Sequence, residues 1–273
     1  MAIRNIALTV SILAFSSVAA SAADLPMRTK APPLVVSPAY SWSGFYVGGN
    51  IGYGWGNADT FFNPLPSAAT FFNLLPQTLS PDPKGVFGGV QAGYNWQAGK
   101  FVVGVEADIQ AADIHGSVLV NPIIQNNGTP FPGAGFLAAS QKIDWFGTVR
   151  GRAGFTPVDR LLLYATGGLA YGGVSSFATT DFRPVGTTQY PASSNNTKFG
   201  WTVGAGAEWA FAQNWSAKVE YLYIDLGSES ATVNAIPLLP PFQVAYHWRT
   251  TEHTVRAGLN YKFGWGGPVV AKY

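Results

Sequence analysis

Only 11% of the 273 residues are charged, whereas a soluble domain usually has about 25%. The net charge of +2 and the lack of basic runs argue against a nucleic-acid partner, and the absence of cysteine excludes disulfides and thiolate metal sites. After the N-terminus, no stretch approaches the roughly 18 consecutive apolar residues that a membrane helix needs. A membrane protein of this composition must therefore cross with strands.

The first residues have the pattern of a secretory signal peptide. Arg4 supplies the positive charge, residues 6–19 form an apolar core, and Ala20, Ser21 and Ala22 form a small-residue cleavage site. We expect cleavage after residue 22; the alternative is an uncleaved membrane anchor. Residues 23–43 contain four prolines and little periodic pattern, which predicts an extended N-terminal segment in the periplasm.

From Phe45 onward, apolar residues alternate with glycine and polar residues, which is the period of a β-strand. Such segments are long enough to cross a membrane, since a tilted barrel strand needs about 9–11 residues. The segment at 161–175 is the least regular, because Leu162 and Tyr164 share a face with Thr166. Eight segments are expected to be strands: 45–55, 86–97, 101–111, 142–155, 161–175, 199–211, 215–226 and 254–263.

The connections between these segments are alternately long and short, as in outer-membrane barrels with short periplasmic turns and long extracellular loops. Outward aromatic residues gather near both ends of the strands, which indicates two interfacial girdles. The sequence therefore predicts an all-β fold, an eight-stranded antiparallel transmembrane up-and-down β-barrel over residues 44–263, with a tail at 264–273. An even number of strands puts both termini in the periplasm. A soluble lipocalin-like barrel, the alternative, would place its aliphatic face inside.

The last strand ends in a pattern of its own. Arg256, Gly258, Tyr261 and Phe263 follow a polar-x-Gly-x-x-aromatic-x-aromatic order. That order resembles the C-terminal insertion signal of bacterial outer-membrane proteins, so the barrel assembly machinery is an expected partner. We expect Phe263 to be the end of the signal, although the chain continues beyond it. The alternative for this segment alone is a half-buried strand of a soluble sheet.

Three stretches together resemble a known family: SGFYVGGNIGYG at 43–54, VEYLYIDLG at 219–227 and VRAGLNYKF at 255–263. They are similar to the small barrels of alphaproteobacteria called porin-family or outer-membrane immunogenic proteins, within the OmpA-like group. The resemblance covers residues 43–263 and implies an outer-membrane location, an eight-stranded barrel, abundance and surface antigenicity. It implies no enzymatic residues. The tail after Phe263 and the lack of a C-terminal peptidoglycan-binding domain are departures, and the second argues against a direct anchor to the cell wall.

The predicted inward faces hold cations and carboxylates in nearly equal number. Because eight strands leave room only for side chains, we expect a salt-bridge network that fills the lumen. The alternative is a narrow porin for ions or small solutes, since inward glycines vacate volume. The residues of this predicted network are Glu106, Asp108, Lys142, Asp144, Arg150, Arg152, Glu208, Lys218, Glu220, Arg256 and Lys262.

Neither a catalytic residue nor a cofactor or metal site is expected. Glu106 and Asp108, on the same strand face, could serve acid/base catalysis. Because several cations are expected nearby, the simpler interpretation is that both carboxylates are counter-ions. One class of lipid A deacylase places a serine two residues after a histidine, whereas His253 is followed by Thr254 and Val255. A lipid-modifying enzyme and an adhesin therefore remain minor alternatives.

The long connections contain apolar, proline-containing runs. TFFNPLP at 60–66 is repeated as TFFNLLP at 70–76, and related runs occur at 118–124 and 235–242. These runs either pack on one another over the barrel mouth or expose an apolar surface to a partner. The other expected partners are outer-membrane lipid and lipopolysaccharide. Conduction, ligands and oligomeric state are left open.

Overall fold

The computed structural model describes residues 40–65, 77–125, 127–130, 135–182, 188–236 and 243–264. The chain divides into two compact units, residues 1–38 and 39–273, and the barrel belongs to the second. The predicted signal peptide, nearly all of the N-terminal segment, the second copy of the repeat and the tail after residue 264 lie outside the described residues.

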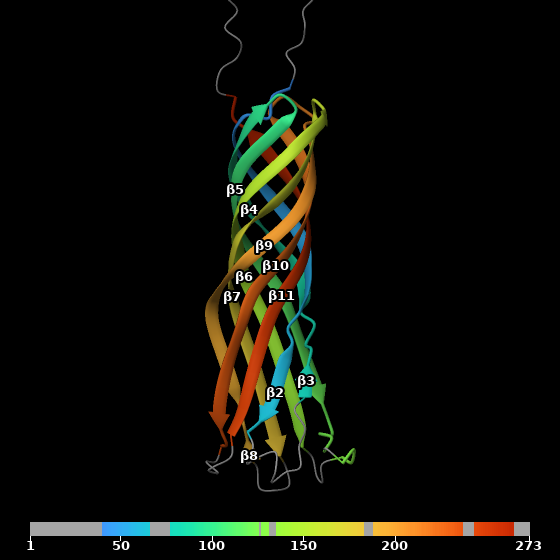
Figure 1. Cartoon of the computed structure of the whole chain (residues 1–273), viewed down its shortest axis with the longest axis vertical. Coiled ribbons are helices and arrows are strands. Elements are labelled where there is room, and N and C mark those ends of the chain that lie inside the picture. Colours follow the sequence, from blue (N-terminus) through green and yellow to red (C-terminus); the bar gives the residue numbers. More distant parts are fainter. Residues whose placement is uncertain are drawn as a thin grey trace, which may run out of the picture. The chain divides into compact units, whose positions relative to one another are not determined.

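Eight long antiparallel strands form a closed ring (Figure 1). Each strand pairs with the next, and the first pairs with the last, so no long edge is left free. The predicted up-and-down barrel is therefore confirmed. Among the described residues, no helix is long and apolar enough to cross a membrane. The strands of the ring are β1 (Gly44–Asn57), β4 (Lys84–Ala98), β5 (Phe101–Val120), β6 (Phe136–Val158), β7 (Leu161–Phe182), β9 (Ala192–Trp209), β10 (Trp215–Asn234) and β11 (Gln243–Lys262).

The two ends of the barrel differ in their connections, as predicted. Short turns join β4 to β5, β6 to β7 and β9 to β10 at one end, called here the turn end. Gly99 in the first of these turns has φ +60°, a conformation that glycine adopts without steric cost. The longer connections lie at the other end, called here the loop end (Figure 1). There β2 (Thr60–Pro64) pairs with β11, β3 (Gln77–Leu79) with β2, and β8 (Thr188–Gln189) with β7.

Most strands extend further toward the loop end than expected. β5 continues to Val120, β9 begins at Ala192, and β11 begins at Gln243 rather than at 254. Beyond the outer aromatic residues no lipid imposes an apolar outer face, and the stretch at 193–197 reads Ser-Ser-Asn-Asn-Thr. The alternation that marks a half-lipid-facing strand is therefore lost, while the backbone ladder continues.

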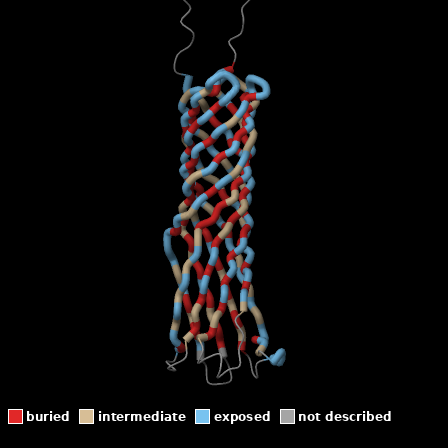
Figure 2. The backbone as a smooth tube through the Cα atoms, viewed as in Figure 1, coloured by how far each residue is buried: buried red, intermediate tan, exposed pale blue. Residues whose placement is uncertain are grey.

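Outward and inward faces alternate along each strand. Outward apolar side chains such as Phe101, Leu169 and Ile51 are each 68% exposed, as a lipid-facing wall requires. Figure 2 shows buried positions distributed along the whole length of the barrel. Near the loop end, the outward rings of Trp55 and Tyr223 both pack on His253. These contacts form part of the predicted girdle.

A β-bulge in β6 reverses the predicted facing of the side chains at 142–144. The pairing register shifts between Ile143 and Trp145 against β7, and between Ala111 and Ile114 against β5. A shift of one residue exchanges the two faces of a strand. Ile143, expected to face lipid, is consequently buried in the lumen, whereas Lys142 and Asp144 point outward. A similar shift in β10 occurs at Gly227, whose φ is +77°.

Apolar and polar layers alternate along the lumen. At the turn end, Tyr40 and Trp42 pack into the barrel mouth beside Leu162. The charged residues come next, followed by a middle apolar layer. The members of the middle apolar layer are Phe87, Ile114, Ile143, Phe146, Ala170, Val174, Leu222, Ile224 and Leu226.

A further apolar cluster lies inside the loop end. It joins Phe62 of the first repeat copy to Tyr190, Tyr246 and Trp248, all of them buried. Its neighbour Phe61 is 40% exposed, because successive residues of β2 face opposite sides. The first repeat copy therefore both packs on the inner core and exposes a ring. Phe242 and the run at 237–242 lie outside the described residues.

Candidate functional site

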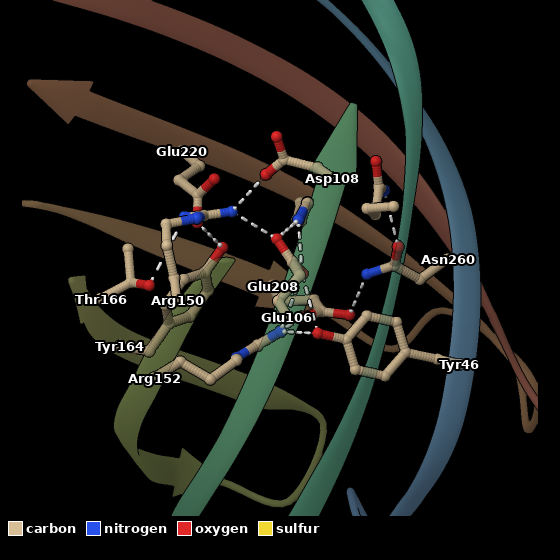
Figure 3. A network of polar contacts seen from close by, with 12 residues as sticks. Tyr46, Glu106, Asp108, Arg150, Arg152, Tyr164, Thr166, Glu208, Glu220 and Asn260 are labelled. Atoms are coloured by element: carbon tan, nitrogen blue, oxygen red, sulfur yellow. Dashed lines mark hydrogen bonds and ion pairs between the residues drawn. The ribbon is translucent and has the colours of Figure 1, made fainter. Parts of the chain in front are cut away.

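Eight of the eleven predicted network residues meet in the lumen, between the turn-end residues Tyr40, Trp42 and Leu162 and the middle apolar layer. Four are cations and four are carboxylates, so their formal charges cancel. All eight side chains are buried. Figure 3 shows the part of the network around Glu106, Arg150 and Arg152. The members of this lumen network are Glu106 and Asp108 on β5, Arg150 and Arg152 on β6, Glu208 on β9, Lys218 and Glu220 on β10, and Arg256 on β11.

Glu106 is the centre of the network. Its Oε1 lies 2.6 Å from Arg150 Nη2 and 2.8 Å from Lys218 Nζ. Its Oε2 accepts a 2.7 Å hydrogen bond from the Tyr46 hydroxyl and lies 3.5 Å from Arg152 Nη1. Arg256 Nη2 is 3.4 Å from Oε1. One buried carboxylate, 3% exposed, thus faces four cations.

Two arginines connect Glu106 to the other carboxylates. Arg150 donates to Glu220 at 2.9 Å and to Asp108 at 3.0 Å. Arg256 donates from Nε to Glu220 Oε2 at 2.6 Å and from both Nη atoms to Asp108 Oδ2 at 3.1 Å. The planar guanidinium presents several donors in fixed directions, so each arginine can bridge carboxylates on different strands.

A second group around Glu208 extends the network toward β1. Arg152 Nη2 donates to Glu208 at 2.7 Å, and its guanidinium lies 4.1 Å from the centre of the Tyr164 ring. Glu208 also accepts from Asn260 Nδ2 at 2.8 Å. Asn260 in turn accepts from Gln91 Nε2 at 2.8 Å. Beyond Glu208, the network therefore continues as hydrogen bonds between uncharged side chains.

Strand register brings these partners together. Glu106 lies opposite Arg150, and Glu220 opposite Arg256, in adjacent strands. Lys218 lies opposite Glu208 but reaches across the lumen to Glu106 instead. Directly opposite side chains on one face are about 4.5–5.5 Å apart at Cβ, within reach of an ion pair. Burying a charge is costly unless it is paired, so removing one partner of a buried pair costs about 3–5 kcal/mol.

The other three predicted residues lie elsewhere. Lys142 and Asp144 form an exposed ion pair of 2.7 Å on the outer wall, because the bulge in β6 reverses their side. Lys262 lies at the turn end, where its Nζ contacts the backbone oxygen of Ser41 and lies 4.2 Å from the centre of the Tyr40 ring. Assigning these three residues to the lumen network was wrong.

Several polar partners escaped the sequence reasoning. The hydroxyls of Tyr46 and Tyr164 donate to Glu106 and Glu220, and Thr148 donates to Asp108 at 2.7 Å. All three occupy inward positions of the period-2 pattern, so the alternation that located the charged residues could have located them as well. Among the described residues, no group of three or more His, Cys, Asp or Glu side chains is placed to hold a metal.

The turn end is capped by residues assigned to the N-terminal segment. Trp42 is 2% exposed, and its Nε1 donates to the backbone oxygen of Asp159 at 3.0 Å. Its backbone N–H donates to Gln97 Oε1 at 2.7 Å. Residues 40–43 are therefore part of the barrel mouth.

The residues of the predicted insertion signal divide between the two faces of β11. Arg256 belongs to the lumen network, and a Cβ on Gly258 would lie 3.1 Å from the backbone oxygen of Gly49. Tyr261 and Phe263 lie on the outside, with ring centres 5.2 Å apart. Phe263 also stacks on Phe45 at 5.6 Å. The two aromatic residues therefore join the ends of the first and last strands.

A family model described as "Outer membrane protein beta-barrel domain" matches residues 10–263. The chain belongs to this family. A 31 kDa outer-membrane immunogenic protein from Brucella melitensis is 40% identical over 93% of this chain and 97% of its own length. A 22 kDa outer membrane protein from Rhizobium leguminosarum is 31% identical over 84% of this chain and 81% of its own length. The protein is thus an outer-membrane barrel similar to outer-membrane proteins of alphaproteobacteria, among them one named immunogenic, as the sequence motifs implied.

Solved structures similar to this family member are more distant in sequence. OprG from Pseudomonas aeruginosa is 11% identical, with a TM-score of 0.44, and the match covers 82% of this chain and 97% of that one. The outer membrane protease OmpT from Escherichia coli is also 11% identical, with a TM-score of 0.45, over 80% of this chain and 97% of that one. Neither similarity says anything about activity.

Proposed function

We propose that this protein is a closed structural barrel of the outer membrane, with both termini in the periplasm and its loop end at the cell surface. The observation that supports closure is the succession of layers in the lumen. A network of zero net charge blocks the space on one side of the middle apolar layer. The loop-end cluster fills the space on the other side.

The middle apolar layer is the barrier that an ion would find hardest to cross. The rings of Phe87 and Phe146 meet edge to face at 5.1 Å, and Ile114, Ile143 and Leu222 pack around them. The cavity in this layer has a volume of about 10 Å³, close to the minimum of about 10–15 Å³ that holds one water molecule. A hydrated ion has no room there.

From the sequence alone, the inward glycines favoured a pore because they vacate volume. Their contacts in the folded barrel support closure instead. A Cβ on Gly93 would lie 2.4 Å from the Tyr46 hydroxyl, and one on Gly206 would lie 2.6 Å from the Tyr164 hydroxyl. The missing side chains therefore make room for large neighbours rather than for a water path. The porin alternative loses its main support.

Two experiments test the proposal. Liposomes that contain the refolded protein should take up no sugars, whereas steady uptake would indicate a pore. A protease site inserted between β2 and β3 should be cut in intact cells. Cleavage only after the outer membrane has been permeabilised would reverse the proposed orientation.

A further inference from the structure

The outer wall has a polar hollow near the loop end that the closed-barrel function does not explain. It has a volume of about 640 Å³ and is formed by neighbouring strands β5, β6, β7 and β9. Outward hydroxyls of Ser117, Ser140 and Ser193 line it, together with Asn195. Phe177 lies among them with 41% of its surface exposed. Elsewhere on the outer wall, apolar and charged side chains lie in separate regions. An exposed aromatic ring surrounded by hydroxyl and amide groups is unusual there.

Strand register aligns the lining residues. Ser117 pairs with Ser140, Ser140 with Phe177, and Phe177 with Ser193, so one row crosses four strands. At about 4.8 Å between strands, this row is about 14 Å long. A row of that length can contact a short oligosaccharide.

The hollow lies just outside the membrane interface. The outward rings of Trp145, Tyr171 and Phe199 follow one another with centres 6.1 and 6.5 Å apart, and such a band marks the level of the headgroups. Asn195 lies on the same strand as Phe199, about 13 Å along it toward the loop end at about 3.3 Å per residue. With a strand tilt of about 40°, this is about 10 Å in height. At that height the barrel faces headgroup sugars rather than acyl chains.

The ionisable side chains that line the hollow, Asp113, His115 and Lys142, are already paired. Lys142 lies 2.7 Å from Asp144, and His115 lies 3.2 Å from Asp113. Neither the Lys142 ammonium nor the His115 ring is therefore without a partner that a bare phosphate would have to displace. Serine hydroxyls both donate and accept hydrogen bonds, as a sugar hydroxyl requires. The Phe177 ring offers an apolar surface for the C–H face of a sugar ring.

We propose that this hollow binds sugar units of the outer-leaflet glycolipid, the core oligosaccharide of lipopolysaccharide. Such a site would hold a defined lipid beside the barrel. Its role in the cell rests on the proposed function, in which the loop end faces the cell surface. Binding by the purified protein does not depend on that orientation. A failure of the topology experiment is therefore distinguishable from a failure of this proposal.

The test uses the full-length protein in phosphatidylglycerol nanodiscs, titrated with delipidated core oligosaccharide in a calorimeter. Phe177→Ala and Ser140→Leu should each weaken binding by about tenfold or more. The control Phe199→Ala removes an outward ring, 76% exposed, from the aromatic band outside the hollow and should leave binding unchanged. Heat-modifiable migration in gels verifies that each variant has folded.

Three outcomes would overturn the proposal. The first is no binding of the oligosaccharide by the wild type. The second is an equal loss in Phe177→Ala and Phe199→Ala, which would indicate general contact with the aromatic band. The third is binding of lipid A or of inorganic phosphate alone with no contribution from the sugars, which would assign the hollow to an anion.

Discussion

Removing one charge from the lumen network should cost far more stability than removing an exposed one. Glu106→Gln leaves four cations facing three carboxylates. Lys218, at 2.8 Å, loses the carboxylate that it contacts, and Arg150, at 2.6 Å, keeps only Asp108 and Glu220. Because both groups are buried, we expect a loss of about 3–5 kcal/mol in the free energy of unfolding. The control Asp144→Asn removes a carboxylate of the exposed pair with Lys142 and should change that free energy by no more than about 1 kcal/mol.

The assay is reversible urea unfolding in phospholipid vesicles, followed by tryptophan fluorescence. A second single variant, Lys218→Met, removes one cation. The double variant Glu106→Gln/Lys218→Met then has a network of zero net charge. The double variant should therefore lose less stability than the sum of its two single variants, by about 1 kcal/mol or more. Additive losses, or a loss in Glu106→Gln as small as in Asp144→Asn, would refute the view that charge balance governs this lumen.

Three further predictions concern other parts of the barrel. Glu252 is buried beside the middle apolar layer, and both of its carboxylate oxygens lack a hydrogen-bond partner among the described residues. Glu252→Leu should therefore raise the free energy of unfolding by about 1–3 kcal/mol in the same urea assay. A decrease in that free energy would indicate that the carboxylate has a partner. Val105→Arg and Leu259→Arg place a cation on the lipid face and should each lose about 2–4 kcal/mol in urea, and unchanged stability would contradict the assigned facing. Deletion of residues 264–273 should leave heat-modifiable migration intact while Phe263→Ala impairs it, and the reverse result would place the insertion signal in the tail.

The strand count and the facing of most residues were predictable because lipid and lumen impose opposite chemistry on alternate positions. That contrast is absent beyond the aromatic band, so the extensions of β5, β9 and β11 left no signal. The bulge in β10 has a visible cause in Gly227, whose positive φ suits glycine. The bulge in β6 falls at Asp144, where no glycine marks it, and this is why Lys142 and Asp144 were placed inside.

The composition of the lumen network was predictable, whereas its pairings were not. Alternation alone places Glu106 and Arg150 on inward faces, but their direct opposition depends on the register between β5 and β6. The connection between those strands is long, and a long loop does not define a register as a two-residue turn does. The role of the inward glycines also depends on register, between other strands: Tyr46 of β1 lies opposite Gly93 of β4, and Tyr164 of β7 lies opposite Gly206 of β9.

Single-channel recording in planar bilayers tests the closed barrel most directly. With the lumen blocked by the charged network and the middle apolar layer, the wild-type protein should show no steady conductance at any applied voltage that the bilayer tolerates. Reproducible, ion-selective channels whose selectivity is lost in Arg150→Ala or Glu106→Ala would contradict the account and make the lumen network a selectivity filter.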